Sequence, residues 1–209
     1  MAEAGAWPSI REHGLLSTSA LLDLYGYEGE ERFAIESQRR AQIVRLTRAA
    51  TGETALVRDN KPLRLDNLEA CLIDMTSREW CDLLNRKVFF WVSAKRLNTL
   101  LRARAYKSRP HDVLTIDAQA LIERDLDRLA LALINIGATI YPTATRRGSQ
   151  TFLPIADYPL DEYIRWRGKE DAIVELAAEY AVYDVQSVTL RVERRFRDQI
   201  MEVLWDGSP

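Results

Sequence analysis

Helical and strand patterns alternate in short pieces along this chain, without an internal repeat and without a linker that would mark a domain boundary. Helical patterns come first, and strand patterns are interleaved with helices further along. This order is typical of an α+β fold. Because a chain of 209 residues more commonly forms one large domain than two small ones, we expect residues 1–209 to fold as a single domain.

The composition is that of a globular protein, with 47% hydrophobic residues available for a core. No apolar run approaches the roughly 20 residues needed to cross a bilayer, and the N-terminus lacks a basic start followed by an apolar stretch. We therefore expect a cytoplasmic protein with no membrane partner. Two cysteines without a nearby histidine, and only two histidines in all, argue against a disulfide framework, a metal site and a catalytic Ser-His-Asp or Cys-His set.

Local patterns place the individual elements. Apolar spacing and capping residues predict helices, with Gly14 ending the first, Ser17 or Ser19 beginning the second, Thr76 or Ser77 beginning the one over residues 77–85, and Asp117 beginning a later one. Alternating or β-branched runs predict strands, and Thr51-Gly52 predicts a hairpin turn. The expected helices cover residues 4–13, 20–25, 28–40, 77–85, 93–106, 117–125 and 161–168; the expected strands cover 43–59 as a hairpin, 87–92, 111–117, 172–182 and 186–195, followed by an amphipathic tail. Residues 129–159 read as strand fragments joined by a long loop.

Common nucleotide-binding and catalytic signatures are absent. No glycine-rich Rossmann or P-loop motif occurs, and metalloprotease, kinase and nucleophile-elbow patterns are missing too. Three short segments remain in a suggestive order: His13–Ser17 (HGLLS), Ile35–Arg40 (IESQRR) and Ala172–Leu176 (AIVEL), with KVFFWV between the second and the third.

These segments, together with the run WPSIRE before the first, resemble ADP-ribosyltransferase folds, especially the DarT-type nucleic-acid ADP-ribosyltransferases. The resemblance implies a split mixed sheet around a central cleft, flanked by N-terminal helices, with NAD as the substrate. The first strand of that family has no visible counterpart, because the helical pattern begins close to Met1.

The resemblance also implies roles for particular residues. Breaking the bond between nicotinamide and ribose builds positive charge on the sugar, which a carboxylate can stabilise. An arginine can bind the diphosphate or orient the acceptor. The implied catalytic residues are Glu175 and Arg40, with Arg39 as a substitute, and the implied NAD-pocket residues are Gly14, Leu15, Ser17 and Phe90. A plainer reading stays open for each charged group: the arginines are a solvated pair at a helix end, and Glu170 or Glu179 replaces Glu175.

Between Leu83 and His111 the chain carries eight basic residues and no acidic one. Such a segment favours a phosphate-bearing partner, and Arg102, Arg104 and Lys107 are the candidate contacts with single-stranded nucleic acid. The alternative is an ordinary solvated helix face.

Three functions follow. The preferred one is a toxin-like NAD-dependent ADP-ribosyltransferase, with nucleic acid as acceptor or an antitoxin-like protein as partner. The second is a catalytically silent domain of the same fold that binds nucleic acid or a protein. The third is a small toxin or immunity-type interaction protein of unrelated fold.

Overall fold

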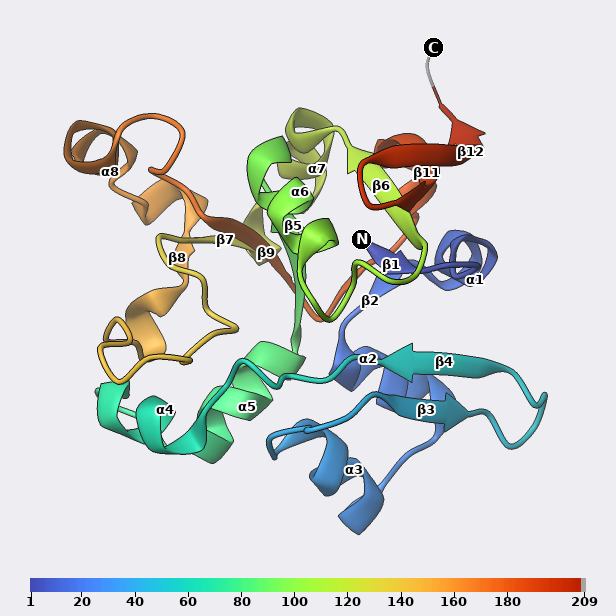
Figure 1. Ribbon diagram of the computed structural model, residues 1–209, viewed down its shortest axis with the longest axis horizontal. Helices are drawn as coiled ribbons and strands as arrows, with labels where there is room; N and C mark the ends of the chain where they lie inside the picture. Colours follow the sequence, from blue (N-terminus) through green and yellow to red (C-terminus); the bar gives the residue numbers. More distant parts are fainter. Residues whose placement is uncertain (208–209) are drawn as a thin grey trace.

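The computed structural model describes residues 1–207 and contains two separate four-stranded sheets, one toward the right and one toward the centre and left of Figure 1. The first sheet has the order β1 (Ala2–Glu3), β6 (His111–Ile116), β11 (Thr189–Phe196), β12 (Gln199–Asp206). The second has the order β5 (Lys87–Trp91), β9 (Glu175–Glu179), β7 (Leu129–Ala132), β8 (Leu153–Pro154). Two further pairs are β2 (Leu15–Leu16) with β10 (Ala181–Val182), and the hairpin β3 (Val44–Thr47) with β4 (Thr54–Val57).

Helices surround these sheets. They are α1 (Trp7–His13), α2 (Thr18–Tyr25), α3 (Gly29–Glu36), α4 (Leu65–Cys71), α5 (Ser77–Asn85), α6 (Ala94–Arg102), α7 (Ala118–Asp125) and α8 (Leu160–Arg167). The α+β class expected from the sequence is therefore confirmed. The expected mixed sheet is wrong, since the strands form several separate sheets in which every pair of named strands runs antiparallel.

Capping residues begin the helices where the sequence indicates. The Ser17 hydroxyl accepts a hydrogen bond from the backbone N–H of Ala20, and the Asp117 carboxylate accepts from two backbone N–H groups of α7. Thr76 and Glu79 form a reciprocal capping box at α5. These contacts satisfy backbone donors that the first helical turn cannot satisfy by itself.

Three sequence-based expectations about elements are wrong. A short strand, β1, precedes the first helix and pairs with β6, and α1 begins at Trp7 rather than at Ala4. The expected C-terminal tail is strand β12, paired with β11. Helix α4 lies where no helix or strand is expected from the sequence. Each of these elements is short or lies at an edge, so its local signal is weak.

One apolar core joins the two sheets. Val88 and Leu176 of the second sheet pack with Val192 of the first, and Trp7 of α1 belongs to the same cluster. Separate clusters lie beneath α4 and α5, and between α2, α3 and the β3–β4 hairpin. The hairpin and the N-terminal helices are thereby held beside the space between the two sheets.

Asp112 of β6 anchors the start of the chain to the first sheet. Its side chain is fully buried and accepts a hydrogen bond from the backbone N–H of Gly5 at 2.8 Å, while Arg194 of β11 forms an ion pair with it at 3.0 Å. The charge of Arg194 offsets the cost of burying this carboxylate. Asp112 therefore fixes where α1 begins, and with it one wall of the candidate site.

Candidate functional site

A cavity of about 840 Å³ lies between the two sheets and the N-terminal elements. Its walls come from the segment before α1, from β2, from the β3–β4 hairpin and the residues after it, and from β5 and β6. This volume is within the range of sites that enclose a small-molecule ligand.

Five of the sequence-predicted site residues line this one cavity: Gly14, Leu15, Ser17, Arg40 and Phe90. They come from three separate parts of the chain, around Gly14–Ser17, Arg40 and Phe90, which only the tertiary fold brings together. Arg39 and Glu175 do not line it.

Gly14 is required by the close approach of two backbone segments. It ends α1 with a φ of +90°, and a Cβ atom at this position would lie 2.6 Å from the carbonyl oxygen of Val182 in β10. Strand β10 pairs with β2, which follows Gly14 directly. The HGLLS turn is thus locked against the segment that follows β9.

Ser17 and Phe90 line the cavity but are also used by the fold. The Ser17 hydroxyl caps α2, and its backbone N–H donates to the carbonyl oxygen of Tyr180 at 2.9 Å. The half-buried Phe90 packs against the core cluster that joins the sheets, as does Leu15. These residues shape the wall of the cavity rather than present free polar groups to it.

Arg40 and Arg39 are separated by the fold. Arg40 is 9% exposed and donates from Nε to the carbonyl oxygen of Arg58 at 3.1 Å and from Nη1 to that of Ile35. Arg39 points elsewhere, donating to the carbonyl oxygens of Leu63 and Lys61. Only Arg40 lines the cavity. Both side chains donate hydrogen bonds to backbone carbonyl oxygens, so the alternative of a solvated pair at a helix end does not hold.

Glu175 begins β9 and is only 5% exposed. Burial raises the pKa of Glu175 to about 8, although the charges of Arg96 and Arg147 and a hydrogen bond from the Ile136 backbone act in the opposite direction. A carboxyl with this pKa is mostly protonated at pH 7, and a neutral carboxyl stabilises developing positive charge poorly. Its surroundings argue against the charged role that the sequence suggested.

Glu179, at the other end of β9, has the opposite environment. Its carboxylate lies 2.9 Å from Nε of Arg86 and 2.8 Å from Nζ of Lys87. Burial raises the pKa of Glu179, but the hydrogen bonds and charges of Lys87 and Arg86 outweigh this and hold the pKa below its ordinary value. Glu179 is therefore ionised at pH 7.

The register of β5 and β9 relates both glutamates to the cavity. Lys87 is paired with Glu179 and Trp91 with Glu175, and the cavity follows β5 from Lys87 to Phe90. Neither glutamate lines the cavity itself, but Lys87, the partner of Glu179, does, whereas Trp91, the partner of Glu175, does not. The residue after Glu179, Tyr180, has a φ of +66°, an uncommon conformation for a residue with a side chain and one that concentrates at functional sites.

Sequence alternation could not have separated these glutamates. Glu175 and Glu179 are four residues apart in a strand, so both lie on the same face of β9. Only the pairing with β5 and the charges around each one distinguish them.

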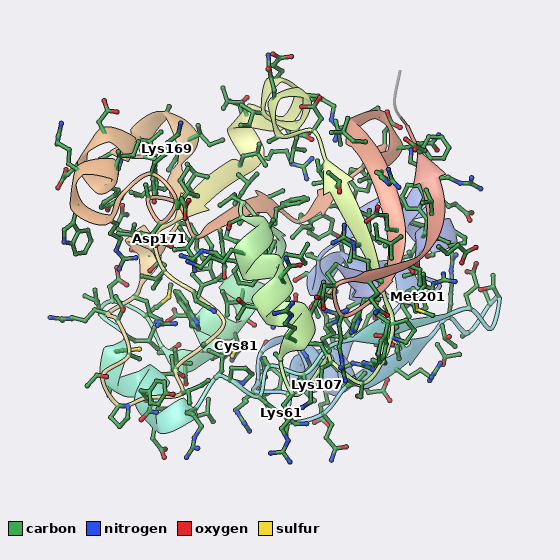
Figure 2. All side chains as sticks on the ribbon, turned by 45° about the horizontal axis from the view of Figure 1, so that its top comes forward. Lys61, Cys81, Lys107, Lys169, Asp171 and Met201 are labelled. Atoms are coloured by element: carbon green, nitrogen blue, oxygen red, sulfur yellow. The ribbon has the colours of Figure 1, made fainter. Side chains whose placement is uncertain are left out.

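The basic segment is largely neutralised by acidic residues from distant parts of the chain. Arg86 and Lys87 pair with Glu179, Arg96 with Asp171, Arg102 with Asp198, and Arg109 with Glu3. Asp171 lies beside α6, and Lys107 lies in the segment that follows that helix (Figure 2). Lys95, Arg104 and Lys107 form no ion pair within residues 1–207. The continuous positive patch expected from the sequence is therefore reduced to scattered charges.

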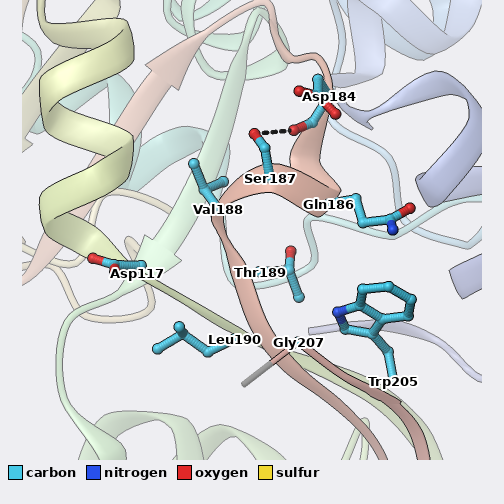
Figure 3. Close-up of a pocket in the computed structure, with 9 residues that line it drawn as sticks. All are labelled: Asp117, Asp184, Gln186, Ser187, Val188, Thr189, Leu190, Trp205 and Gly207. Atoms are coloured by element: carbon cyan, nitrogen blue, oxygen red, sulfur yellow. Dashed lines mark hydrogen bonds between the residues drawn. The ribbon is translucent and has the colours of Figure 1, made fainter. Parts of the chain in front are cut away.

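A second, smaller cavity of about 440 Å³ lies at the end of the first sheet (Figure 3). No basic side chain lines it, and its Asp117 already caps α7. The Ser187 hydroxyl donates to the carbonyl oxygen of Asp184 at 2.8 Å. This cavity is poorly suited to an anionic ligand.

A family model covers most of the chain, from residue 1 to residue 189. The protein belongs to DUF7002, a family of unknown function. The matched range of DUF7002 includes every element that lines the larger cavity, whereas β12 lies beyond it. No curated protein and no solved structure matches the chain. In residues 1–207 no helix is long and apolar enough to cross a membrane, and no three potential ligands are grouped as a metal site.

Proposed function

We propose that this DUF7002 protein is an NAD-dependent ADP-ribosyltransferase whose substrate binds in the cavity between the two sheets. The observation that carries the proposal is the convergence of Gly14, Leu15, Ser17, Arg40 and Phe90 on one cavity. The resemblance implies that these residues share one site, and residues that act on one ligand must lie close together. The split antiparallel sheets on either side of the cavity are compatible with an ADP-ribosyltransferase-like fold.

In the proposed reaction, the bond between ribose C1′ and the nicotinamide nitrogen breaks, and its electron pair leaves with nicotinamide. A nucleophilic atom of the acceptor then bonds to C1′ and loses its proton to the solvent. Positive charge develops on the ribose between these events, so an ionised carboxylate beside the sugar lowers the barrier. We assign this role to Glu179, because Lys87 and Arg86 keep it ionised and because Lys87, with which it forms an ion pair, lines the cavity.

The acceptor is better sought among proteins and small molecules than among nucleic acids. Five of the eight cations in the basic segment already have acidic partners. Neutralised arginines release few counterions on binding a phosphate backbone, so they contribute little affinity for nucleic acid.

The test is nicotinamide release from NAD by the wild-type protein and by three glutamine variants. Glu179→Gln should lower the rate about 100-fold or more, because the charge that stabilises the transition state is lost. Glu175→Gln should retain most of the rate, and Glu170→Gln at an exposed position serves as the control. Labelled NAD with separate protein, RNA and single-stranded DNA mixtures then identifies the acceptor class.

The outcomes separate the competing functions. Loss of activity in Glu175→Gln alone would return the carboxylate role to Glu175. A wild-type protein that binds NAD but never releases nicotinamide would support a silent domain of the same fold. A protein that does not bind NAD at all would refute the proposal.

A further inference from the structure

Arg40 and Arg58 meet at one part of the cavity wall. Arg58 follows β4, and its carbonyl oxygen accepts the hydrogen bond from Nε of Arg40 at 3.1 Å. The Arg40 backbone N–H donates to Oδ1 of Asn60 at 2.6 Å, which holds the two segments together. Both arginine side chains line the cavity.

Neither arginine has an ion-pair partner among the described residues. Burial lowers the pKa of Arg40 to about 10 and also lowers the pKa of Arg58. The acidic residue Glu3 lies near Arg58, but its carboxylate pairs with Arg109 at 3.3 Å. Asp59 also lies close enough to act on both arginines, and Glu36 on Arg40, but none of these carboxylates forms an ion pair with them. A buried Arg40 and a half-buried Arg58 without a paired carboxylate are costly, and an anionic ligand would reduce that cost.

Several N–H groups of these arginines remain available. Within residues 1–207, Nη2 of Arg40 and Nε and Nη1 of Arg58 have no acceptor. None of these atoms is sealed from solvent, unlike the unpartnered Nε of Arg109. They are therefore donors that a ligand in the cavity can reach.

His111 and Tyr106 hold the Arg58 side chain in place. His111 is fully buried, and its Nε2 lies 3.0 Å from the carbonyl oxygen of Tyr106, which can only accept, so Nε2 carries the proton. Nδ1 then faces Nη2 of Arg58 at 3.4 Å as an acceptor. The Arg58 guanidinium also lies over the Tyr106 ring, 5.1 Å from its centre. A guanidinium fixed on two sides loses little freedom when it binds a ligand.

We propose that Arg40 and Arg58 form a binding site for a diphosphate group, with His111 and Tyr106 as positioning residues for Arg58. Planar guanidinium groups match phosphate oxygens with paired donors, and two of them suit two linked phosphates. The identity of the whole ligand rests on the proposed function, in which NAD supplies the diphosphate. The anion site itself depends only on the two arginines.

The test is calorimetric titration of the protein with inorganic pyrophosphate at low salt. Wild type should bind, and Arg58→Gln should weaken binding about 10- to 100-fold, as expected for the loss of charge-assisted hydrogen bonds. Arg58→Lys should recover part of the affinity because the charge remains. Arg39→Gln is the matched control, since Arg39 also donates to two carbonyl oxygens but lies outside the cavity. Thermal unfolding of each variant establishes that it is folded.

Each result distinguishes this inference from the proposed function. Pyrophosphate binding that Arg58→Gln weakens and Arg39→Gln does not would establish the site, whether or not NAD is cleaved. Absence of pyrophosphate binding, or equal binding by wild type and a folded Arg58→Gln, would overturn the inference even if the protein cleaves NAD. Equal weakening by Arg39→Gln would also overturn it, since general charge would then explain the binding.

Discussion

Replacing Glu175 by glutamine is expected to stabilise the protein increasingly as the pH rises from about 5 to about 9. Burial raises the pKa of Glu175 from 4.5 to about 8. Between these values the unfolded chain has lost the proton and the folded protein still holds it, so the free energy of unfolding falls with pH. At about 1.4 kcal/mol per pH unit, the difference between the two pKa values lowers the free energy of unfolding by about 5 kcal/mol in all.

Glutamine has nearly the same shape and cannot ionise, so Glu175→Gln avoids this loss. The variant should match wild type near pH 5 and be more stable by about 2 to 5 kcal/mol at pH 9. The measurement is urea unfolding, followed by circular dichroism at constant ionic strength across this pH range.

Glu179→Gln is the matched control on the same strand and should behave in the opposite way. Lys87 and Arg86 hold the pKa of Glu179 below its ordinary value, so its contribution to stability is present above the unfolded pKa and is lost as the pH falls. This variant should be less stable than wild type at pH 7. A Glu175→Gln protein that is no more stable than wild type at pH 9 would refute the reasoning about the buried carboxyl.

Three further predictions concern the walls of the cavity and the basic segment. Gly14→Ala should lower the free energy of unfolding by at least about 2 kcal/mol, because the new Cβ would meet the Val182 carbonyl oxygen. Gly26→Ala, where no atom lies within 4 Å of the new Cβ, should lower it by about 1 kcal/mol. Both are measured by urea unfolding, and equal losses would contradict this prediction. Asp112→Asn should cost about 2 kcal/mol and speed hydrogen exchange at the Gly5 amide, and unchanged exchange there would mean that Asp112 does not anchor β1. Arg102→Gln should leave the free energy of unfolding nearly unchanged, because its ion pair with Asp198 is exposed, and a clear loss of stability in thermal unfolding would show that the pair is structural.

Features that depend on neighbouring residues could be predicted from the sequence. The Ser17, Thr76 and Asp117 caps, the hairpin around Thr51-Gly52 and the strand KVFFWV all lie where the sequence places them. A cap satisfies the backbone of its own helix, and a turn joins adjacent strands, so their signals lie within a few residues. Of the seven residues that the resemblance implies for the NAD site, five line one cavity, and Arg39 and Glu175 do not.

The charged groups of the site were decided by tertiary structure alone. Arg39 and Arg40 are adjacent in sequence, yet only Arg40 reaches the cavity, because carbonyl oxygens of distant segments direct each side chain. Glu175 and Glu179 share one face of β9, and their opposite pKa shifts come from burial in one case and from Lys87 and Arg86 in the other. The acidic partners of the basic segment lie far away in the sequence, as does His111 from Arg58. Burial and charge pairing depend on contacts between residues remote in the chain, and no local pattern records them.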